Sequence, residues 1–278
     1  MDWSKTKTIF IVVFLILDIF LFTLFLNKYQ SSQYEVIAES DLEEKINEDN
    51  IQYNILPVDV EPLSYLNAEA HVFSSADIDS LSRQTAVVEN RFTLRSELDV
   101  PIKVNDFQNP AEVNSFLSQS VINGQQYTFW EYDEDNARLI YYQEYEDTPF
   151  YFNLNGRIVF QLDENMSVIS YEQTMLDSVE EFAEEQSIIT PMNALETFYR
   201  HALLERGSEV IAANLGYYTF IQLTESQVLS PTWRFVIEEE DGDRKSLYLN
   251  AVEGQVIDID EDSLELKTLE EENDDAVE

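Results

Sequence analysis

The chain has 278 residues and a formal net charge of −39 at pH 7, because 55 Asp and Glu outnumber 16 Lys and Arg. A surface this acidic repels the phosphates of nucleic acids and of anionic lipids, which excludes nucleic acid as a partner. Hydrophobic residues still make up 44% of the chain and aromatic residues 13%, so the chain can bury a large core. Cysteine is absent, which excludes a disulfide framework and a thiol nucleophile.

A long apolar run begins at Ile9 and ends at Leu26, with the sequence IFIVVFLILDIFLFTLFL. At about 1.5 Å per residue, a helix of this length spans roughly 27 Å, enough for the hydrocarbon core of a bilayer. Two lysines precede the run and acidic residues soon follow it. The positive-inside rule therefore predicts a cytoplasmic N-terminus at residues 1–8, a transmembrane anchor at 9–28 and an extracytoplasmic remainder at the cell membrane. A cleaved signal peptide is the alternative, although the segment after the run lacks a small-x-small cleavage site.

Asp18 lies near the middle of this run, where a carboxylate is unfavourable. On insertion scales a central Asp costs about 2.5–3.5 kcal/mol, whereas the sixteen apolar residues together contribute roughly 5–10 kcal/mol, so the helix is expected to insert. Polar groups in membrane helices usually contact another helix; a polar residue tolerated in the wetter part of the helix is the alternative. The predicted partner-binding face consists of Asp18 and the side chains three, four and seven residues away, which are Phe14, Leu15, Leu21, Phe22 and Phe25.

Short helices and strands are predicted beyond the anchor. Ser40-Asp-Leu-Glu43 has the pattern of a capping box and opens a helix in a juxtamembrane linker at residues 29–50. Strands are expected at 50–58 and 67–74, followed by a short helix capped by Ser75. A strand with one buried face is then predicted from alternating side chains, the inward ones being Phe92, Leu94, Ser96 and Leu98.

Two later segments share one pattern, in which a helix is followed by aromatic strands and a Gly turn. Asn109-Pro110 begins the first predicted helix, and Thr190-Pro191 begins the second, which is expected to end at Gly207. The strands that follow each helix meet at an Asn and a Gly, at 151–165 and at 248–262, where the Gly supplies the positive φ of a hairpin turn. This pattern predicts an extracytoplasmic α+β fold of two related lobes, each an antiparallel sheet with a packed helix.

The two lobes are expected at residues 51–176 and 177–262. The repeated match is short and one residue out of step between the two segments. Residues 263–278 have too little apolar surface to order themselves, so they are predicted to form a disordered acidic tail.

The residues typical of catalysis are scarce. The chain has two histidines, His71 and His201, and lacks the motifs of serine hydrolases, zinc proteases and phosphate-binding loops. Acidic clusters at 131–136, 238–243 and 258–262 do not have the spacing of a calcium loop; solvated turns are expected there, with a weak Ca²⁺ site as the alternative. We therefore expect a protein that is not an enzyme, with no cofactor and no metal. A hydrolase that depends on the two histidines is the disfavoured alternative.

Two stretches carry a family resemblance. The start, MDWSKTKTIFIVVFLILDIFLF, resembles the N-terminus of the YycI (WalI) family of Firmicutes. The stretch PTWRFVIEEEDGDRKSLYLNAVEGQVID resembles the last strand and hairpin of YycI-like and PepSY-like domains, although this hairpin alone is a weak match. The resemblance implies a regulator that acts, together with a YycH-like partner, on the essential sensor histidine kinase YycG (WalK), which governs cell-wall metabolism. It also implies that the transmembrane helix makes much of the contact, with Asp18 as its polar point.

The leading hypothesis is therefore a non-enzymatic regulator of a two-component signalling system that acts on the kinase through its transmembrane helix. A homodimer or a heterodimer is compatible with it, as are activation and inhibition of the kinase. The alternative is an extracytoplasmic module that binds wall glycan or peptide and is only tethered by its helix. Aromatic residues at 126–132 and 140–145 could form a stacking platform for such a ligand, but alternating aromatics in a sheet more often belong to the core.

Overall fold

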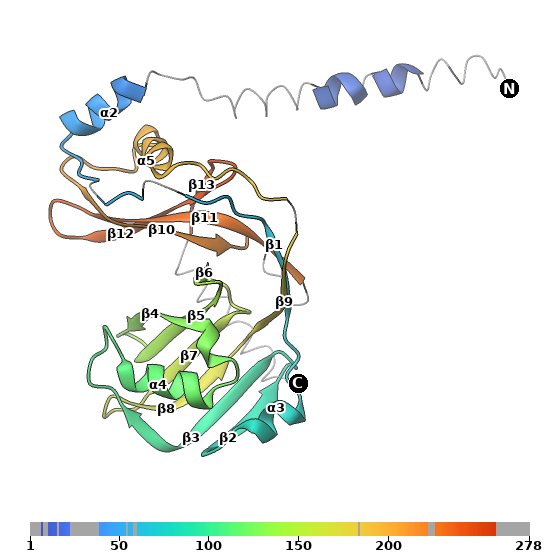
Figure 1. Cartoon of the computed structure of the whole chain (residues 1–278), viewed down its shortest axis with the longest axis vertical. Coiled ribbons are helices and arrows are strands. Elements are labelled where there is room, and N and C mark those ends of the chain that lie inside the picture. The colour runs from blue at the N-terminus through green and yellow to red at the C-terminus, as the bar shows by residue number, and fades with distance from the viewer. Residues whose placement is uncertain are drawn as a thin grey trace.

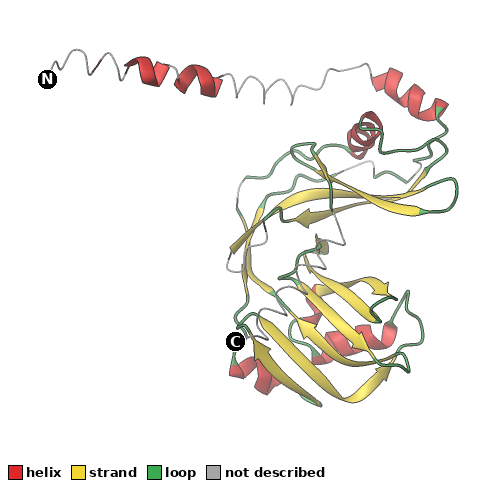
Figure 2. Ribbon diagram, turned by 180° about the vertical axis from the view of Figure 1, so that it is seen from behind, coloured by secondary structure: helices red, strands yellow, loops and turns green. Residues whose placement is uncertain are grey.

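The computed structural model is dominated by β-structure, with a few short helices at its surface (Figures 1 and 2). Besides the helical residues 11–15 and 17–22, the described helices are α2 (Glu39–Glu48), α3 (Ser75–Ser80), α4 (Ala111–Ser120), the 3-10 turn η1 (Gly124–Gln126) and α5 (Pro191–Arg200). The residues that the structure describes are 7, 11–15, 17–22, 39–53, 55–57, 60–182, 184–221 and 226–259.

The strands form one sheet. They are β1 (Leu66–Ala70), β2 (Gln84–Glu89), β3 (Thr93–Lys103), β4 (Tyr127–Asp133), β5 (Arg138–Tyr145), β6 (Thr148–Tyr151), β7 (Arg157–Leu162), β8 (Ser167–Gln173), β9 (Leu176–Glu181), β10 (Glu209–Tyr218), β11 (Ser226–Glu238), β12 (Arg244–Asn250) and β13 (Val256–Ile257). Over the described part of the chain, these thirteen strands are hydrogen-bonded in the order β13-β12-β11-β10-β6-β5-β7-β8-β3-β2, with β4 beside β5, and β1 beside β11 and β9.

The prediction of two lobes with separate antiparallel sheets is wrong on this point, because a single mixed sheet runs through both halves. The link is β6, which pairs antiparallel with β5 and parallel with β10. Glu146 and Asp147 both adopt a positive φ and turn the chain tightly from β5 into β6. Phe150 of β6 then lies opposite Tyr217 of β10. This pairing joins residues 67 positions apart, which a local sequence pattern does not reveal.

Each half of the sheet buries its own core under a helix. In the first half, Val113 and Leu117 of α4 pack against buried side chains of β3, β5, β7 and β8. In the second half, α2 and α5 lie on β10, β11 and β12 (Figure 1). Ala194, Leu195 and Phe198 of α5 are fully buried there, as their helical spacing requires. A helix packed on each half therefore agrees with the sequence prediction.

Several local predictions are confirmed by the structure. Leu94 and Ser96 of β3 are fully buried while Arg95 and Glu97 are exposed, as the alternation indicated. Thr190 caps α5, since its hydroxyl accepts a hydrogen bond of 3.3 Å from the backbone NH of Asn193.

Other local predictions are wrong. The described residues of 50–58 contain no strand beyond an isolated bridge at Gln52. The cap of α3 is Ser74 rather than Ser75, because both the NH and the hydroxyl of Ser74 donate to Asp77 at 2.7 Å. Gly207 does not end α5, which already stops at Arg200, where Ala202 turns the chain with a φ of 57°.

The two predicted Gly hairpins have different outcomes. Gly254 has a φ of 73° and follows β12, which turns back into β13 as expected. Gly156 does not adopt a positive φ. The strands on either side of it, β6 and β7, both pair with β5 rather than with each other, so no hairpin forms here. The boundary between lobes at residue 176 stays a prediction, and the acidic tail at 263–278 lies outside the described residues.

Candidate functional site

The predicted partner-binding face begins in the helical residues near the N-terminus. Residues 11–15 and 17–22 are helical, and no helix within the described residues is both long and apolar enough to cross a membrane. Asp18, Leu21 and Phe22 share one helical stretch at three- and four-residue spacing, so they lie on one face. Phe14 and Leu15 belong to the preceding stretch, and Phe25 lies outside the described residues.

The apolar side chains of this segment are exposed. Phe14 is 59% exposed, Leu15 55%, Leu21 52% and Phe22 60%, and Asp18 is exposed among them. Exposed apolar side chains in such number are unfavourable in water and mark a surface that another apolar phase or a partner covers. The helical residues thus have the properties of a contact element, and no described part of the same chain covers them.

In the outer part, an aromatic seam joins the two halves of the sheet. The ring of Trp130 in β4 makes edge contacts with Tyr142 and Phe152 and a tilted contact with Tyr151. Tyr151 and Phe152 also contact Tyr248 of β12. The guanidinium of Arg234 in β11 lies 4.2 Å from the centre of the Trp130 ring, a cation–π contact between the halves.

The seam includes two of the aromatic residues whose role the sequence left open, Trp130 and Tyr142. Tyr142, Tyr151 and Phe152 are at most 5% exposed, so they belong to the core that holds the halves together. Burial raises the pKa of the Tyr151 phenol well above its ordinary value. Within the two stretches that could form a stacking platform, Tyr127, Tyr141 and Tyr142 are at most 6% exposed, so these three offer no open ring face to a sugar.

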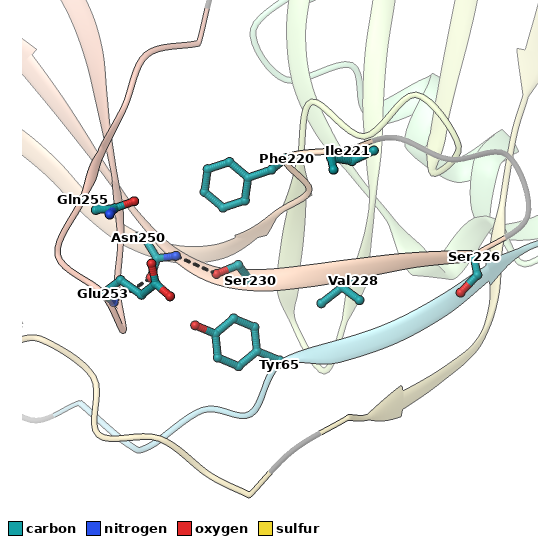
Figure 3. A pocket seen from close by; sticks show the side chains of 9 residues that line it. All are labelled: Tyr65, Phe220, Ile221, Ser226, Val228, Ser230, Asn250, Glu253 and Gln255. Atoms are coloured by element: carbon teal, nitrogen blue, oxygen red, sulfur yellow. Dashed lines mark hydrogen bonds between the residues drawn. The ribbon is translucent and has the colours of Figure 1, made fainter. Parts of the chain in front are cut away.

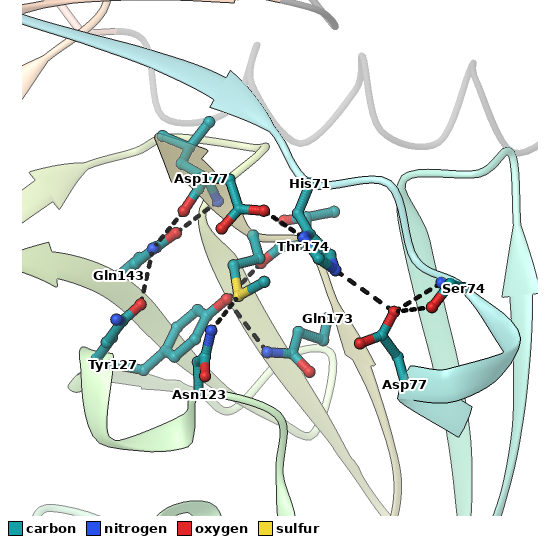
Figure 4. Close-up of polar contacts among 12 residues, drawn as sticks. His71, Ser74, Asp77, Asn123, Tyr127, Gln143, Gln173, Thr174 and Asp177 are labelled. Carbon is teal, nitrogen blue, oxygen red and sulfur yellow. Dashed lines mark hydrogen bonds and ion pairs between the residues drawn. The ribbon is translucent and has the colours of Figure 1, made fainter. Parts of the chain in front are cut away.

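His71 lies between two carboxylates at the end of β1 (Figure 4). Its Nδ1 is hydrogen-bonded to the Asp177 carboxylate of β9, and its Nε2 lies 3.7 Å from Oδ2 of Asp77 in α3. The hydrogen bond from the Ser74 hydroxyl, and then the nearby His71, hold the pKa of Asp77 below its usual value. The cluster ties β1, β9 and α3 together. Ser74 donates its hydroxyl proton to Asp77 rather than to His71, so the arrangement is not that of an activated nucleophile.

Within the described residues, the second histidine and the acidic clusters at 131–136 and 238–243 give no sign of a catalytic or metal centre. His201 is exposed at the C-terminal cap of α5, in the other half of the sheet. Asp133, in the first acidic cluster, is engaged by Asn136 and by Arg138 at 2.6 Å. Across the described residues, no group of three or more His, Asp or Glu side chains is placed to hold a metal ion.

Sequence reasoning missed the arginines on the open face of the first half. Arg95, Arg138 and Arg157 line a hollow of about 500 Å³ there. Arg95 pairs with Glu172 at 3.1 Å and Arg138 pairs with Asp133 at 2.6 Å. The alternation that predicted the buried face of β3 also places Arg95 on the opposite face, so the position of Arg95 could have been inferred. Its proximity to Arg138 of β5 and Arg157 of β7 could not, because it depends on which strands pair.

Comparison with known proteins gives one family match. The family model described as YycI protein matches residues 31–252, which includes nearly all of the sheet. No curated protein matches the chain. A solved structure, described as an uncharacterized protein from Eubacterium rectale, is similar with a TM-score of 0.43 and 13% identity, over 76% of this chain and 91% of that one.

Proposed function

The chain belongs to the YycI family, whose members are accessory regulators of the YycG kinase system, and from this premise we propose that it regulates the sensor kinase through contacts of its N-terminal helix. In this proposal the chain is not an enzyme and acts together with a YycH-like partner. In this proposal the outer sheet pairs with that partner. The kinase output controls cell-wall metabolism.

We place the protein in the cell membrane as a single-pass protein with its N-terminus in the cytoplasm. The apolar run from Ile9 to Leu26 has the length of a membrane-spanning helix, and the lysines before it favour the cytoplasmic side. A bilayer would cover the side chains of residues 11–22 that are exposed in the structure. It would also concentrate the helix and the kinase helices in the same plane.

The observation that carries the proposal is the position of Asp18 within an exposed apolar helix face. Asp18 shares its helix face with Leu21 and Phe22, so a partner helix can receive the carboxyl by a hydrogen bond while packing against the apolar neighbours. A helix shifts the signalling equilibrium only by the difference in its affinity for the two kinase states. Shifting a ratio from 1:99 to 99:1 requires about 5.5 kcal/mol, so a modest bias needs only one or two such contacts.

The experiment substitutes residues on and off this face in cells that carry the kinase. Asp18→Leu and Phe22→Ala are expected to reduce co-purification with the kinase and to change transcription of its target genes. Asp18→Asn keeps a hydrogen-bonding side chain and is expected to retain part of both. Phe20→Ala is the matched control, because residue 20 lies on the opposite side of the helix from Asp18. If Asp18→Leu and Phe22→Ala behave like the wild type at equal membrane abundance, the helix face is not the contact.

A second candidate is a module that binds wall glycan or peptide and for which the helix is only a tether. A cavity lined by residues of β11, Tyr65 and Glu253 favours it. Replacing residues 9–26 with an unrelated apolar span separates the two. Loss of regulation supports the helix contact, whereas full regulation through the foreign span supports the outer sheet as the working part.

A further inference from the structure

A crevice lies on one edge of β11, where the neighbouring strand changes from β1 to β12. Leu229 of β11 lies opposite Leu66, at the start of β1, while Thr232 lies opposite Asn250, at the end of β12. Between them, the carbonyl of Pro231 accepts a hydrogen bond of 2.8 Å from the NH of Ala251, just after β12, and Ser230 has a place in neither strand pairing. The ends of β1 and β12 therefore leave a cavity of about 620 Å³ over this junction (Figure 3). Small-molecule sites commonly have this volume.

The floor of the crevice is polar and held in place. Asn250, 3% exposed, donates from Nδ2 to the hydroxyl of Ser230 at 3.0 Å. Its Oδ1 accepts hydrogen bonds from the backbone NH groups of Val252 and Glu253, at 2.9 and 2.8 Å. These bonds hold the backbone of the turn that carries Glu253. The Glu253 side chain is therefore already placed at the edge of the crevice before a ligand binds.

One wall of the crevice is apolar and exposed. Phe220 is 56% exposed, Ile221 70% and Val228 47%. The ring of Phe220 packs edge-on against Tyr218, with 5.3 Å between the ring centres, which orients it. Exposed apolar side chains beside an ordered polar floor are typical of a surface that a ligand covers.

Tyr65 and Glu253 supply the polar contacts on the other side. In Figure 3 the phenol of Tyr65 points toward Glu253 and Ser230. Burial, and then the Glu253 carboxylate, raise the pKa of the Tyr65 phenol, so it stays protonated at neutral pH and keeps a hydrogen to donate. Of the nine residues that line the crevice, Glu253 has the only carboxyl group, and none is Lys, Arg or His.

We propose that this crevice binds an organic cation, an amine carried on an apolar body, with Glu253 as the counter-ion. The apolar body would cover Phe220, Ile221 and Val228, and the amine would lie between Glu253 and the ring faces of Tyr65 and Phe220, where a cation is attracted by the aromatic quadrupole. An anionic ligand would meet Glu253 and a chain of net charge −39, which disfavours it. This site is separate from the helix contact and does not depend on it.

The test is calorimetric titration of the full chain in lipid nanodiscs with two short peptides. The first probe is acetyl-Leu-Lys-Phe-amide, and the second is the same peptide with its lysine acetylated, which removes the charge and keeps the apolar body. The lysine peptide is expected to bind at least about 10-fold more tightly, the effect of one charge-assisted hydrogen bond of roughly 1.5 kcal/mol or more. Glu253→Gln is expected to abolish this difference between the probes.

Two control variants separate the site from general effects of charge and surface. Glu164→Gln removes a carboxylate from the exposed turn between β7 and β8 and is expected to leave the preference for the lysine peptide unchanged. Val228→Trp fills the crevice and is expected to prevent binding of both peptides. Val87→Trp makes the same change at a strand residue of similar exposure, 51%, and is expected to have no effect.

Three results would overturn the proposal. These are equal affinity for the two peptides, an equal response to Glu253→Gln and Glu164→Gln, and no measurable binding of either peptide at millimolar concentration. Tighter binding of the acetylated peptide would instead identify the crevice as a site for neutral apolar ligands.

Discussion

Phe14 and Phe22, in the helical residues near the N-terminus, are 59% and 60% exposed, whereas Phe160 and Phe235 in the sheet are fully buried. The same side chain therefore has two uses in this protein. In the sheet, phenylalanine stabilises the fold through the apolar area it removes from water. Near the N-terminus it contributes nothing to the packing of the described sheet, so its value must lie in a contact with something else. The contrast separates residues that determine stability from residues that determine association.

The largest expected effect comes from a core substitution compared with an N-terminal one. Trp233→Ala removes a ring that is 1% exposed, packs on Phe235 and donates from Nε1 to the Ile189 carbonyl at 2.8 Å. We expect it to lower the free energy of unfolding by about 3–5 kcal/mol, as measured by urea denaturation. Phe20→Ala removes a ring that is 58% exposed and should leave the unfolding of the sheet unchanged. Similar destabilisation by both would show that the N-terminal helix is part of the folded core.

A smaller effect is expected where the two halves of the sheet meet. A Cβ added at Gly216 of β10 would lie 2.3 Å from Cζ of Tyr151, which is 1% exposed and has little room to move. Gly216→Ala should therefore destabilise the sheet by about 1–3 kcal/mol. In Gly242→Ala the added methyl group meets nothing within 4 Å, and only the left-handed φ of 94° adds a strain of roughly 1 kcal/mol. Unfolding in one cooperative transition in both variants would confirm that the halves act as one unit.

The cation–π contact across the seam should give a weaker signal. A double-mutant cycle of Arg234→Met and Trp130→Leu isolates the interaction of the guanidinium with the ring. We expect a coupling energy of about 0.5–2 kcal/mol. A coupling near zero would mean that the seam is held by the buried aromatic rings alone.

The smallest expected effect depends on pH. The pKa of Asp77 is lowered in the folded chain by the Ser74 hydroxyl, so its contribution to stability is complete above the ordinary Asp pKa of about 4 and disappears as the pH falls through the folded value. Asp77→Asn should therefore destabilise the protein by about 1 kcal/mol at pH 6 and by much less at pH 3. Asp79→Asn, at an exposed residue of the same helix, serves as the control. A constant difference between pH 6 and pH 3 would contradict this assignment.

The features that the sequence predicted are those decided by neighbouring residues. Thr190-Pro191 caps a helix because the hydroxyl reaches a backbone NH three residues away, and Leu94 is buried because alternation alone assigns its face. The pairing of β6 with β10, in contrast, depends on the free edge that each strand presents in the finished sheet. His71 meets Asp177 across a separation of 106 positions along the chain, so their contact depends on the finished fold. Gly156 and Gly254 look alike in sequence, and their different turns follow from which strand lies between their neighbours.

The candidate sites follow the same division. The apolar run with Asp18 is visible in the sequence because a helix face is a local property. The crevice beside Glu253 is not, since its lining comes from the residue before β1, the segment after β10, β11, the end of β12 and the turn that follows it. These segments meet because β11 pairs first with β1 and then with β12 along the same edge.

Site-specific photocrosslinking in native membranes tests the central claim most directly. A photoreactive amino acid would be placed at Leu21 or Phe22, on the face of Asp18, and at Phe20, on the opposite side of the helix. The proposal predicts crosslinks to the sensor kinase from positions 21 and 22 that are several-fold more abundant than those from position 20. Equal yields from all three positions, or no kinase adduct from any of them, would contradict it.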